Sequence, residues 1–253
     1  MFADRIRLWR LAWSLGWLDI RLRYRGSILG PFWLTISTGV MVGALGFLYS
    51  ALWGMSLREY LPFLALSQVL WSFLATLVGE SCAVFTESEP VIRSIRMPFF
   101  VFAIRTLVRN ILVLGHNICV IVVVFLALRI WPGATALLAI PALPIWIIDG
   151  LALSLLLGGI CARFRDIQPI VNSVMQIAFF VSPVIWKPEQ LKSGAVWLPL
   201  NPFYDMLEIV RGPLLGNAPS HLVFLGALGY SMVLWGAAWL FFLRSRGRIA
   251  FWI

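Results

Sequence analysis

Charged residues are scarce in this chain of 253 residues. Asp, Glu, Lys and Arg make up 12% of it, against about 25% in an ordinary soluble domain. Long runs contain none of them: residues 26–57, 60–79, 110–128, 130–148, 167–186 and 212–243. A helix needs about 20 apolar residues to cross the roughly 30 Å hydrocarbon core of a bilayer. The composition therefore excludes a water-soluble domain and predicts a membrane protein.

The order of these runs predicts the fold class. We expect an all-α membrane protein with about six transmembrane helices, in a single domain over residues 1–253. The spans are predicted at 28–54, 61–84, 99–128, 135–161, 168–186 and 221–243, with 244–253 as a basic cytoplasmic tail. Pro141 and Pro144 lie inside the fourth span and predict a kink there.

Lysine is nearly absent, which excludes a nucleotide-binding motif. The only lysines are Lys187 and Lys192, and neither lies in the Gly-x-x-x-x-Gly-Lys-Ser/Thr pattern that cradles phosphates. We therefore expect no cofactor in this chain, and any ATP hydrolysis that powers it must come from another polypeptide.

Signs of catalysis or of metal binding are also missing. The cysteines Cys82, Cys119 and Cys161 have neither disulfide nor metal-ligand spacing. The histidines His116 and His221 fall in different spans without partners for acid–base chemistry. The sequence predicts no catalytic residue, no metal site and no enzyme.

The basic residues predict the orientation. The net charge of +9 comes from residues that lie between the apolar runs rather than in one patch, so nucleic acid is not expected as a partner. If alternate loops face opposite sides, one side receives only Arg58, Arg129, Lys187, Lys192 and Arg211. Because cytoplasmic loops are rich in Lys and Arg, both termini are predicted in the cytoplasm.

Residues 1–27 are predicted to form a helix before the first span. Trp9, Trp13, Trp17 and Ile20 recur on one face, beside a stripe of arginines. Trp prefers the headgroup level and Arg can reach phosphates, which predicts an amphipathic helix lying in the cytoplasmic interface. A simple topology anchor is the alternative. The candidate lipid-head residues are Trp9, Trp13, Arg23 and Arg25.

A polar segment follows the second span. Thr86 and Glu89 match a capping box, and Pro90 fits a first turn, so we expect a short cytoplasmic helix to start there. A soluble partner could grip such a helix, and a solvated loop is the alternative. Nearby, Arg105 and Arg109 are expected to face the cytoplasmic mouth or the acids Glu80, Glu87 and Glu89, since unpaired charges are costly near lipid.

Residues 187–220 are predicted to lie outside the membrane as a re-entrant region. The segment is too apolar for a free loop and too short in any piece to span. Asn201-Pro202 is typical of a helix start and Arg211-Gly212 of a helix end. We therefore expect short re-entrant helices here, one of them at about 202–211.

Several motifs, taken in order, resemble the permease subunits of type 2 ABC exporters for O-antigen, capsule and teichoic-acid polymers. They are residues 23–33, 85–98, 109–110, 116–117, 163–167, 182–184 and 200–202. The resemblance covers about 21–244. It implies a homodimer in the bacterial inner membrane, in contact with membrane lipids, that moves a lipid-linked polysaccharide through a channel. It also implies two ATP-binding ABC subunits as partners, which would bind ATP and Mg²⁺.

The resemblance also implies roles for individual segments. The helix that couples to the ATPase would contain Glu87, Glu89, Ile92 and Arg93. The N-terminal helix would be a cytoplasmic gate, and residues 187–220 would form an external gate.

Aromatic residues make up 14% of the chain. Sugars stack on aromatic rings through their C–H faces, and a sliding polymer needs many weak contacts. The candidate polymer-path residues are Tyr49, Trp53, Phe179, Phe180 and Trp186. For Tyr49 and Trp53 an aromatic belt at the outer interface is the alternative.

Other functions stay open at this point. A small-molecule or lipid efflux permease of the same superfamily is the nearest. An ion-coupled secondary transporter would use the intramembrane acid Asp149. A membrane enzyme is the third.

Overall fold

A computed structural model of the chain describes residues 2–28, 30, 32–95, 97–191 and 194–253, and the side chains of all of these except 2–7 and 194–196. Predictions that involve Leu29, Pro31, Arg96 and Lys192 lie outside the described residues.

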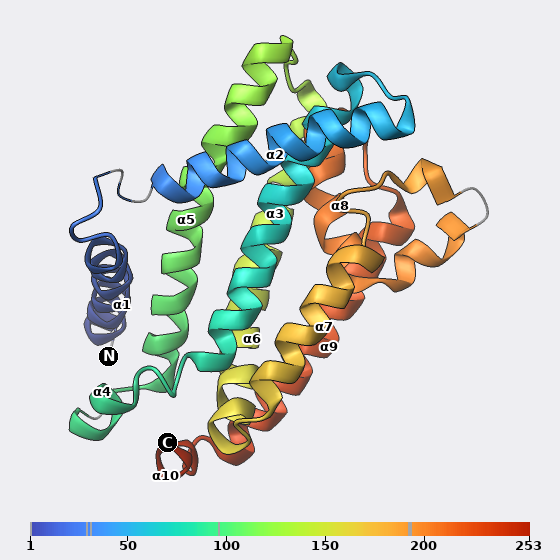
Figure 1. Cartoon of the computed structure of the whole chain (residues 1–253). Helices are drawn as coiled ribbons and strands as arrows, with labels where there is room; N and C mark the ends of the chain where they lie inside the picture. Colours follow the sequence, from blue (N-terminus) through green and yellow to red (C-terminus); the bar gives the residue numbers. More distant parts are fainter. Residues whose placement is uncertain (1, 29, 31, 96, 192–193) are drawn as a thin grey trace.

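Every regular element in the described part of the chain is a helix, which confirms the predicted all-α class (Figure 1). The longer helices are α1 (Phe2–Arg23), α2 (Phe32–Trp53), α3 (Leu57–Ala83), α5 (Phe99–Leu128), α6 (Ala142–Arg163), α7 (Ile167–Val181), α8 (Pro202–Leu214) and α9 (His221–Ser245). The short ones are α4 (Glu89–Ser94), α10 (Ile249–Trp252) and the 3₁₀ segments η1 (Ala134–Ala139), η2 (Pro188–Leu191) and η3 (Gly194–Leu200).

Five helical segments are long and apolar enough to cross a membrane: α2, α3, α5, the η1–α6 segment and α9. Together with the shorter apolar helix α7 they agree with the prediction of about six spans. The predicted fourth span is interrupted at Pro141, where η1 gives way to α6. The expected irregularity is confirmed at that position.

The predicted fifth span, 168–186, is longer than the helix that forms. α7 ends at Val181, which at 1.5 Å per residue makes it about 22 Å long. Ser182 is extended, with φ −83° and ψ 147°, because a residue that precedes proline, here Pro183, disfavours the α conformation.

α3 lies at the centre of the bundle and contacts α2, α5, α6, α7 and α8. Phe73 of α3 stacks on Trp146 of α6, with ring centroids 5.4 Å apart and an interplanar angle of 5°. At Gly150 of α6 a Cβ would lie 2.8 Å from Leu107 and 3.0 Å from Leu77. A small residue there lets α6 approach α3 and α5 closely, which is how helices associate in lipid.

The loops gather at two ends of the bundle (Figure 1). α4, the α6–α7 turn and α10 lie at one end, which we call the α4 end. The α2–α3 turn, the loop after α5, η2 and η3 lie at the other, which we call the α8 end. This grouping is the one that alternate crossing predicts for the helices from α3 onward, whereas α2 runs steeply across α3 and α5 (Figure 1). α8 is buried along much of its length against η1, η3 and α9, and it does not cross the bundle.

Candidate functional site

The α4 end carries the four residues predicted to couple to an ATPase. Glu89 begins α4 and pairs with Arg93 one turn later, at 2.9 Å between Oε1 and Nη2. Arg93 also donates a 2.6 Å hydrogen bond to the backbone oxygen of Ile253. Ile92 packs into the apolar cluster beneath α4, whereas Glu87 and Arg93 are exposed. Ile92 therefore attaches α4 to the bundle, and the charged residues face outward.

The start of α4 differs from the predicted capping box. The residue before the helix is Ser88, and its side chain makes no capping hydrogen bond. The Thr86 hydroxyl donates instead to the Ala83 carbonyl at 3.0 Å, because the chain is still turning out of α3 at that point. Pro90 does occupy the first turn, as expected.

Residues 249–252, predicted only as part of a basic tail, form α10, which contacts α6 and shares an apolar cluster with Ile92 of α4. Ile249 is fully buried in a cluster with Phe85 and Phe102. The Arg163 guanidinium lies 5.2 Å from the centroid of a Trp252 ring. Four residues are too few for a hydrophobic period to be recognised, so no sequence signal could have found this helix.

α1 lies along α5 and buries one row of residues there. Ala12 and Ile20 are buried, and a Cβ at Gly16 would lie 2.9 Å from Val108 Cγ1. The predicted face was therefore wrong for Ile20, which follows Gly16 by one turn and belongs to the row that faces α5. The tryptophans of the neighbouring row, Trp9, Trp13 and Trp17, are each about half exposed, as an interfacial helix requires.

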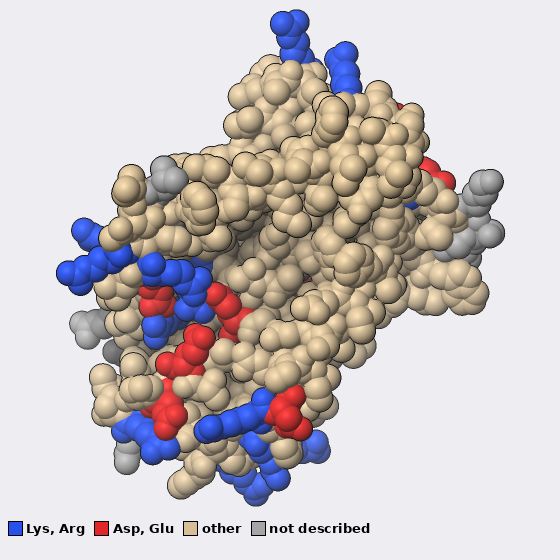
Figure 2. Space-filling model, viewed as in Figure 1, with Lys and Arg blue, Asp and Glu red and all other residues tan. Residues whose placement is uncertain are grey.

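An ion-pair network joins α1, α3 and α5. Arg105 donates two 2.6 Å hydrogen bonds to Asp19. Arg109 pairs with Glu80 at 2.8 Å and approaches Asp19 at 3.6 Å. Arg23 also pairs with Glu80, at 3.2 Å. Acidic and basic side chains accordingly gather on one side of a hollow below α2 (Figure 2).

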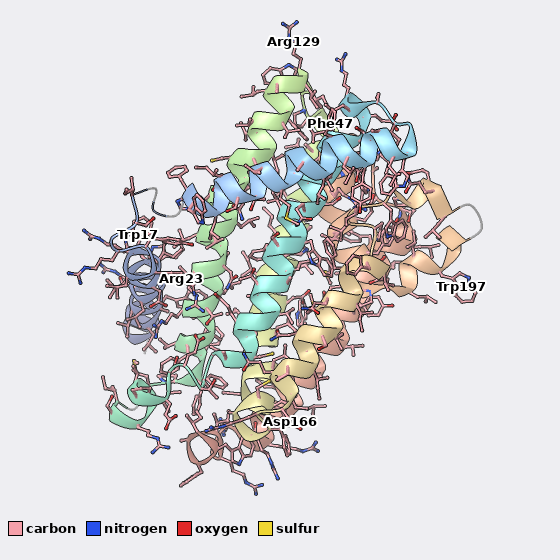
Figure 3. All side chains as sticks on the ribbon, viewed as in Figure 1. Trp17, Arg23, Phe47, Arg129, Asp166 and Trp197 are labelled. Atoms are coloured by element: carbon pink, nitrogen blue, oxygen red, sulfur yellow. The ribbon has the colours of Figure 1, made fainter. Side chains whose placement is uncertain are left out.

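This network shows which acidic groups Arg105 and Arg109 of α5 contact. Glu80 was one of the acids expected for them, and its pairing with Arg109 is confirmed. Asp19 was missed because it belongs to the N-terminal helix, far away in the sequence. Of the candidate lipid-head residues, Arg23 points into this network while Arg25 lies exposed beyond the end of α1 (Figure 3).

The polar side chains of α7 share one face. Gln168, Asn172 and Gln176 recur every four residues and are exposed or half-exposed. A Cβ at Gly79 of α3 would lie 3.6 Å from Asn172 Oδ1, so this face borders α3. The opposite face carries exposed apolar residues: Ile170, Val174, Ile177 and Val181. Lipid solvates the apolar face but not the amides, which need water or protein.

The five predicted polymer-path aromatics divide between two clusters. The Tyr49 and Trp53 ring centroids lie 4.8 Å apart with their planes tilted by 31°, and the Trp53 and Tyr60 centroids lie 5.5 Å apart. The partly buried packing of this first cluster fits the alternative of an aromatic belt as well as it fits a path.

The second aromatic cluster lies at the end of α7. Phe179 packs against Trp71 at 5.7 Å, and Trp186 Nε1 donates a 3.0 Å hydrogen bond to the Phe180 carbonyl. Phe180 is 70% exposed. It is the one of the five whose ring is largely free to contact another molecule.

α8 starts as predicted and ends later. Asn201 Oδ1 accepts a 3.0 Å hydrogen bond from the Phe203 amide, which confirms the N-cap. Arg211 was predicted in an external segment, but its side chain is buried. Its guanidinium donates to Ser67, Glu208 and the Pro183 carbonyl. The segment stays helical to Leu214. Ser67 and Pro183 are distant in sequence from Arg211, so these hydrogen bonds, which attach α8 to the bundle, could not be predicted from the sequence.

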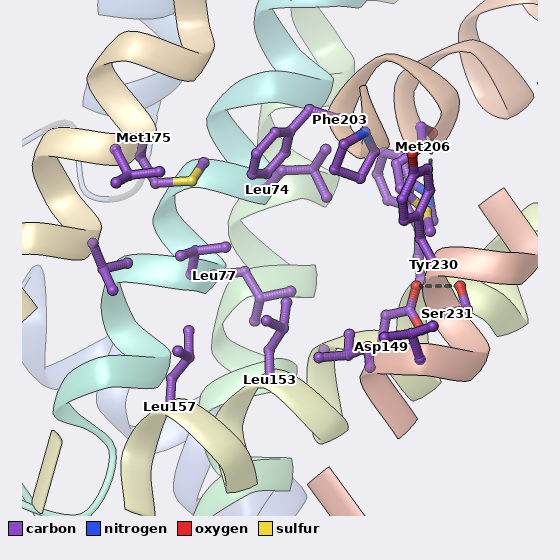
Figure 4. A pocket seen from close by; sticks show the side chains of 18 of the residues that line it. Leu74, Leu77, Asp149, Leu153, Leu157, Met175, Phe203, Met206, Tyr230 and Ser231 are labelled. Carbon is purple, nitrogen blue, oxygen red and sulfur yellow. Dashed lines mark hydrogen bonds between the residues drawn. The ribbon is translucent and has the colours of Figure 1, made fainter. Parts of the chain in front are cut away.

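An apolar cavity of about 510 Å³ lies between α3, α6, α7, α8 and α9 (Figure 4). Asp149 lies at its edge. The Asp149 carboxylate accepts hydrogen bonds from Ser231 at 2.8 Å and from Trp235 Nε1 at 2.6 Å. Asp149 therefore bridges α6 and α9, and this satisfied pairing argues against a carboxylate that exchanges ions. The described residues contain no group of three or more potential metal ligands.

Comparison with known proteins agrees with this architecture. The family model for the ABC-2 type transporter matches residues 10–215. A protein of Myxococcus xanthus named O-antigen export system permease protein RfbA is 23% identical over 197 residues, which cover 77% of this chain and 76% of the relative. A protein of the same name from Klebsiella pneumoniae is 21% identical over 195 residues, which cover 75% of this chain and 74% of the relative. With the family model matched over most of its length, the chain belongs to the ABC-2 type transporter family.

Proposed function

We propose that this chain is the channel-forming permease subunit of an ATP-driven exporter that moves a lipid-linked, O-antigen-like polysaccharide across the bacterial inner membrane. The relatives named as O-antigen export permeases support the substrate class. The single observation that supports a passage is the uncovered polar face of α7.

The α7 amides suit a polysaccharide. Gln168, Asn172 and Gln176 carry no charge. Such groups form interchangeable hydrogen bonds with sugar hydroxyls and do not hold any unit tightly. A second copy of the chain that presented the same face would enclose a polar path between two α7 helices. This supports a homodimer with its channel on the shared axis.

ATP hydrolysis by two ATP-binding subunits would drive transport. These subunits would bind ATP and Mg²⁺ and dock at the α4 end. Glu87 and Arg93 are exposed there, on a helix fixed to the bundle by Ile92. This assignment places the α4 end and both termini in the cytoplasm.

Two regions would control the path. The exposed tryptophans and Arg25 of the N-terminal segment would meet lipid headgroups at the cytoplasmic entrance. The 187–220 region would close the path on the external side.

Cysteine labelling tests the proposed orientation. In intact cells, Arg58→Cys at the α8 end should react with a membrane-impermeant maleimide, and Ser94→Cys in α4 should react only after the membrane is opened. Labelling of Ser94→Cys in intact cells would reverse the orientation and remove the docking surface.

A deletion strain tests the function. Loss of the gene should abolish surface polysaccharide and leave lipid-linked polymer inside the cell. The wild-type gene should restore export, and so should Ile177→Leu on the apolar face of α7, whereas the paired variant Asn172→Leu/Gln176→Leu should restore little. Normal surface polymer in the deletion strain would favour a small-molecule or lipid efflux permease.

A further inference from the structure

A polar cavity of about 440 Å³ lies between α2, α3 and α5, apart from the polar face of α7. Its volume is in the range of about 300–1,000 Å³ that is typical of small-molecule sites. Uncharged hydrogen-bonding side chains line it from all three helices: Thr38, Ser72, Thr76, Asn110 and Asn117. Leu34, Phe73, Val113 and Leu114 add apolar surface to the lining, so the cavity suits an occupant that presents both hydroxyl groups and C–H faces.

The lining includes a buried group without a partner. Asn117 is 6% exposed, and its Oδ1 has no hydrogen-bond partner within the described part of the chain. Gln68, one turn from Ser72 on α3, has an unpartnered Oε1 as well. A buried acceptor left unpaired costs about 1–3 kcal/mol. Gln68 does not line the cavity, so it is Asn117 that indicates an occupant able to donate a hydrogen bond there.

The charged residues of the cavity are already engaged with one another. Glu80 accepts hydrogen bonds from Arg109 at 2.9 Å, from Asn110 at 2.7 Å and from Arg23 at 3.2 Å. Arg23 and Arg109 share the single carboxylate of Glu80, so no carboxylate in the lining is left unpaired for a cation. The groups that are left over are neutral amides and hydroxyls, and these match a ligand with many hydroxyl groups.

We propose that this cavity binds a sugar unit of the exported chain, with Asn117 Oδ1 accepting a hydrogen bond from a sugar hydroxyl. The inference rests on the proposed function and adds a site to it. The α7 face offers exposed amides along which a polymer can slide, whereas this cavity is enclosed by three helices and holds one unit in place. The cavity would therefore bind one sugar unit of the polymer next to the path along which the polymer slides.

Protection from alkylation tests the site. Ser72→Cys is introduced with Cys119→Ser, which removes the exposed native cysteine and leaves the buried Cys82 and Cys161. The complex with its ATPase is treated with a small maleimide, with and without the bacterium's own surface polysaccharide freed of lipid by mild acid. Saturating polysaccharide should slow labelling about tenfold, as expected where about nine-tenths of the sites are occupied. Thr38→Cys provides a second reporter if Ser72→Cys does not fold.

Matched variants give the contrast. Asn117→Leu should weaken the affinity for polysaccharide about tenfold, which corresponds to one lost hydrogen bond, so the same concentration should slow labelling of Ser72→Cys only about twofold. The adjacent Ile118→Val, on an exposed side chain, should leave the affinity unchanged. Equal labelling rates with and without polysaccharide at both reporters would overturn the proposal.

The two proposals fail in different ways. If the deletion strain keeps its surface polymer, the proposed function is wrong, and the proposed sugar site, which depends on it, is wrong as well. If the deletion removes the polymer but Asn117→Leu exports at the wild-type rate and neither reporter is protected, only the cavity assignment is wrong.

Discussion

Arg105 of α5 donates two hydrogen bonds of 2.6 Å to the carboxylate of Asp19 in α1, one from Nε and one from Nη2. The bidentate geometry is the strong form of a guanidinium–carboxylate pair. It fixes the N-terminal helix to the bundle at a point where Arg109 also approaches the same carboxylate. α1 is thus held by the protein and by the interface together.

Removal of either partner should destabilise the protein. Asp19→Asn or Arg105→Gln leaves a charge unpaired in a partly buried place, so each should lower the free energy of unfolding by about 1–3 kcal/mol. The double variant should lose less than the sum, because each change removes the same pair. Thermal unfolding in detergent measures this, with the exposed Arg21→Gln as control. Strictly additive losses would contradict direct coupling.

The two rows of α1 should respond differently to substitution. A Cβ at Gly16 would lie 2.9 Å from Val108 Cγ1 and 3.0 Å from the Arg105 carbonyl, so Gly16→Val should push α1 away from α5 and lower the melting temperature. Trp13→Ala, on the exposed row, should leave the melting temperature unchanged and weaken contact with anionic vesicles. A stable Gly16→Val protein would show that α1 does not depend on this close approach.

Hydropathy predicted the spans because a bilayer demands length and apolar composition, and both are local properties of the sequence. It could not place Ile20, since that residue lies one turn from Gly16 and also three residues from Trp17, and only packing decides which row faces α5. Small residues such as Ala12 and Gly16 were the available signal for the buried row.

Other features depended on distant partners. The sequence predicted Arg211 as the basic end of an external helix. Its hydrogen-bond partners Ser67 and Pro183, however, are distant in the sequence. The polar cavity likewise needs α2, α3 and α5 to be placed side by side. Single residues such as Ser72 and Asn117 carry no distinctive pattern in the sequence.

Glu89→Ala should uncouple transport from ATP hydrolysis without unfolding the protein. Glu89 forms a partly exposed pair with Arg93 at the surface of α4, so the stability change should be below about 1 kcal/mol. Substrate-stimulated ATP hydrolysis by the complex should fall. A variant that assembles and keeps normal stimulation would remove Glu89 from the docking surface.

Asp205 should make stability depend on pH. It lies in α8, outside the five long spans, and burial raises its pKa to about 7. Neither carboxylate oxygen has a hydrogen-bond partner among the residues that the structure describes. Between pH 4 and 7 the folded state keeps a proton that the unfolded state has released, so the free energy of unfolding falls as pH rises and is level above 7.

The variant Asp205→Asn removes this titration. It should be more stable than the wild type at pH 8, by up to about 4 kcal/mol, and little different at pH 4. Melting temperatures in detergent across this range measure the difference. A constant gap between the two proteins would mean that Asp205 is charged in the folded state.

Reconstitution tests the central claim that this chain forms a passage and takes its power from a separate ATPase. The permease and its ATPase are placed in vesicles loaded with the lipid-linked polysaccharide on the accessible leaflet, and polymer that reaches the interior is measured by its resistance to an added glycosidase. Protection of the polymer that requires ATP, both subunits and Mg²⁺ is the predicted result. Protection by the permease alone, or none with both subunits and ATP present, would contradict the account.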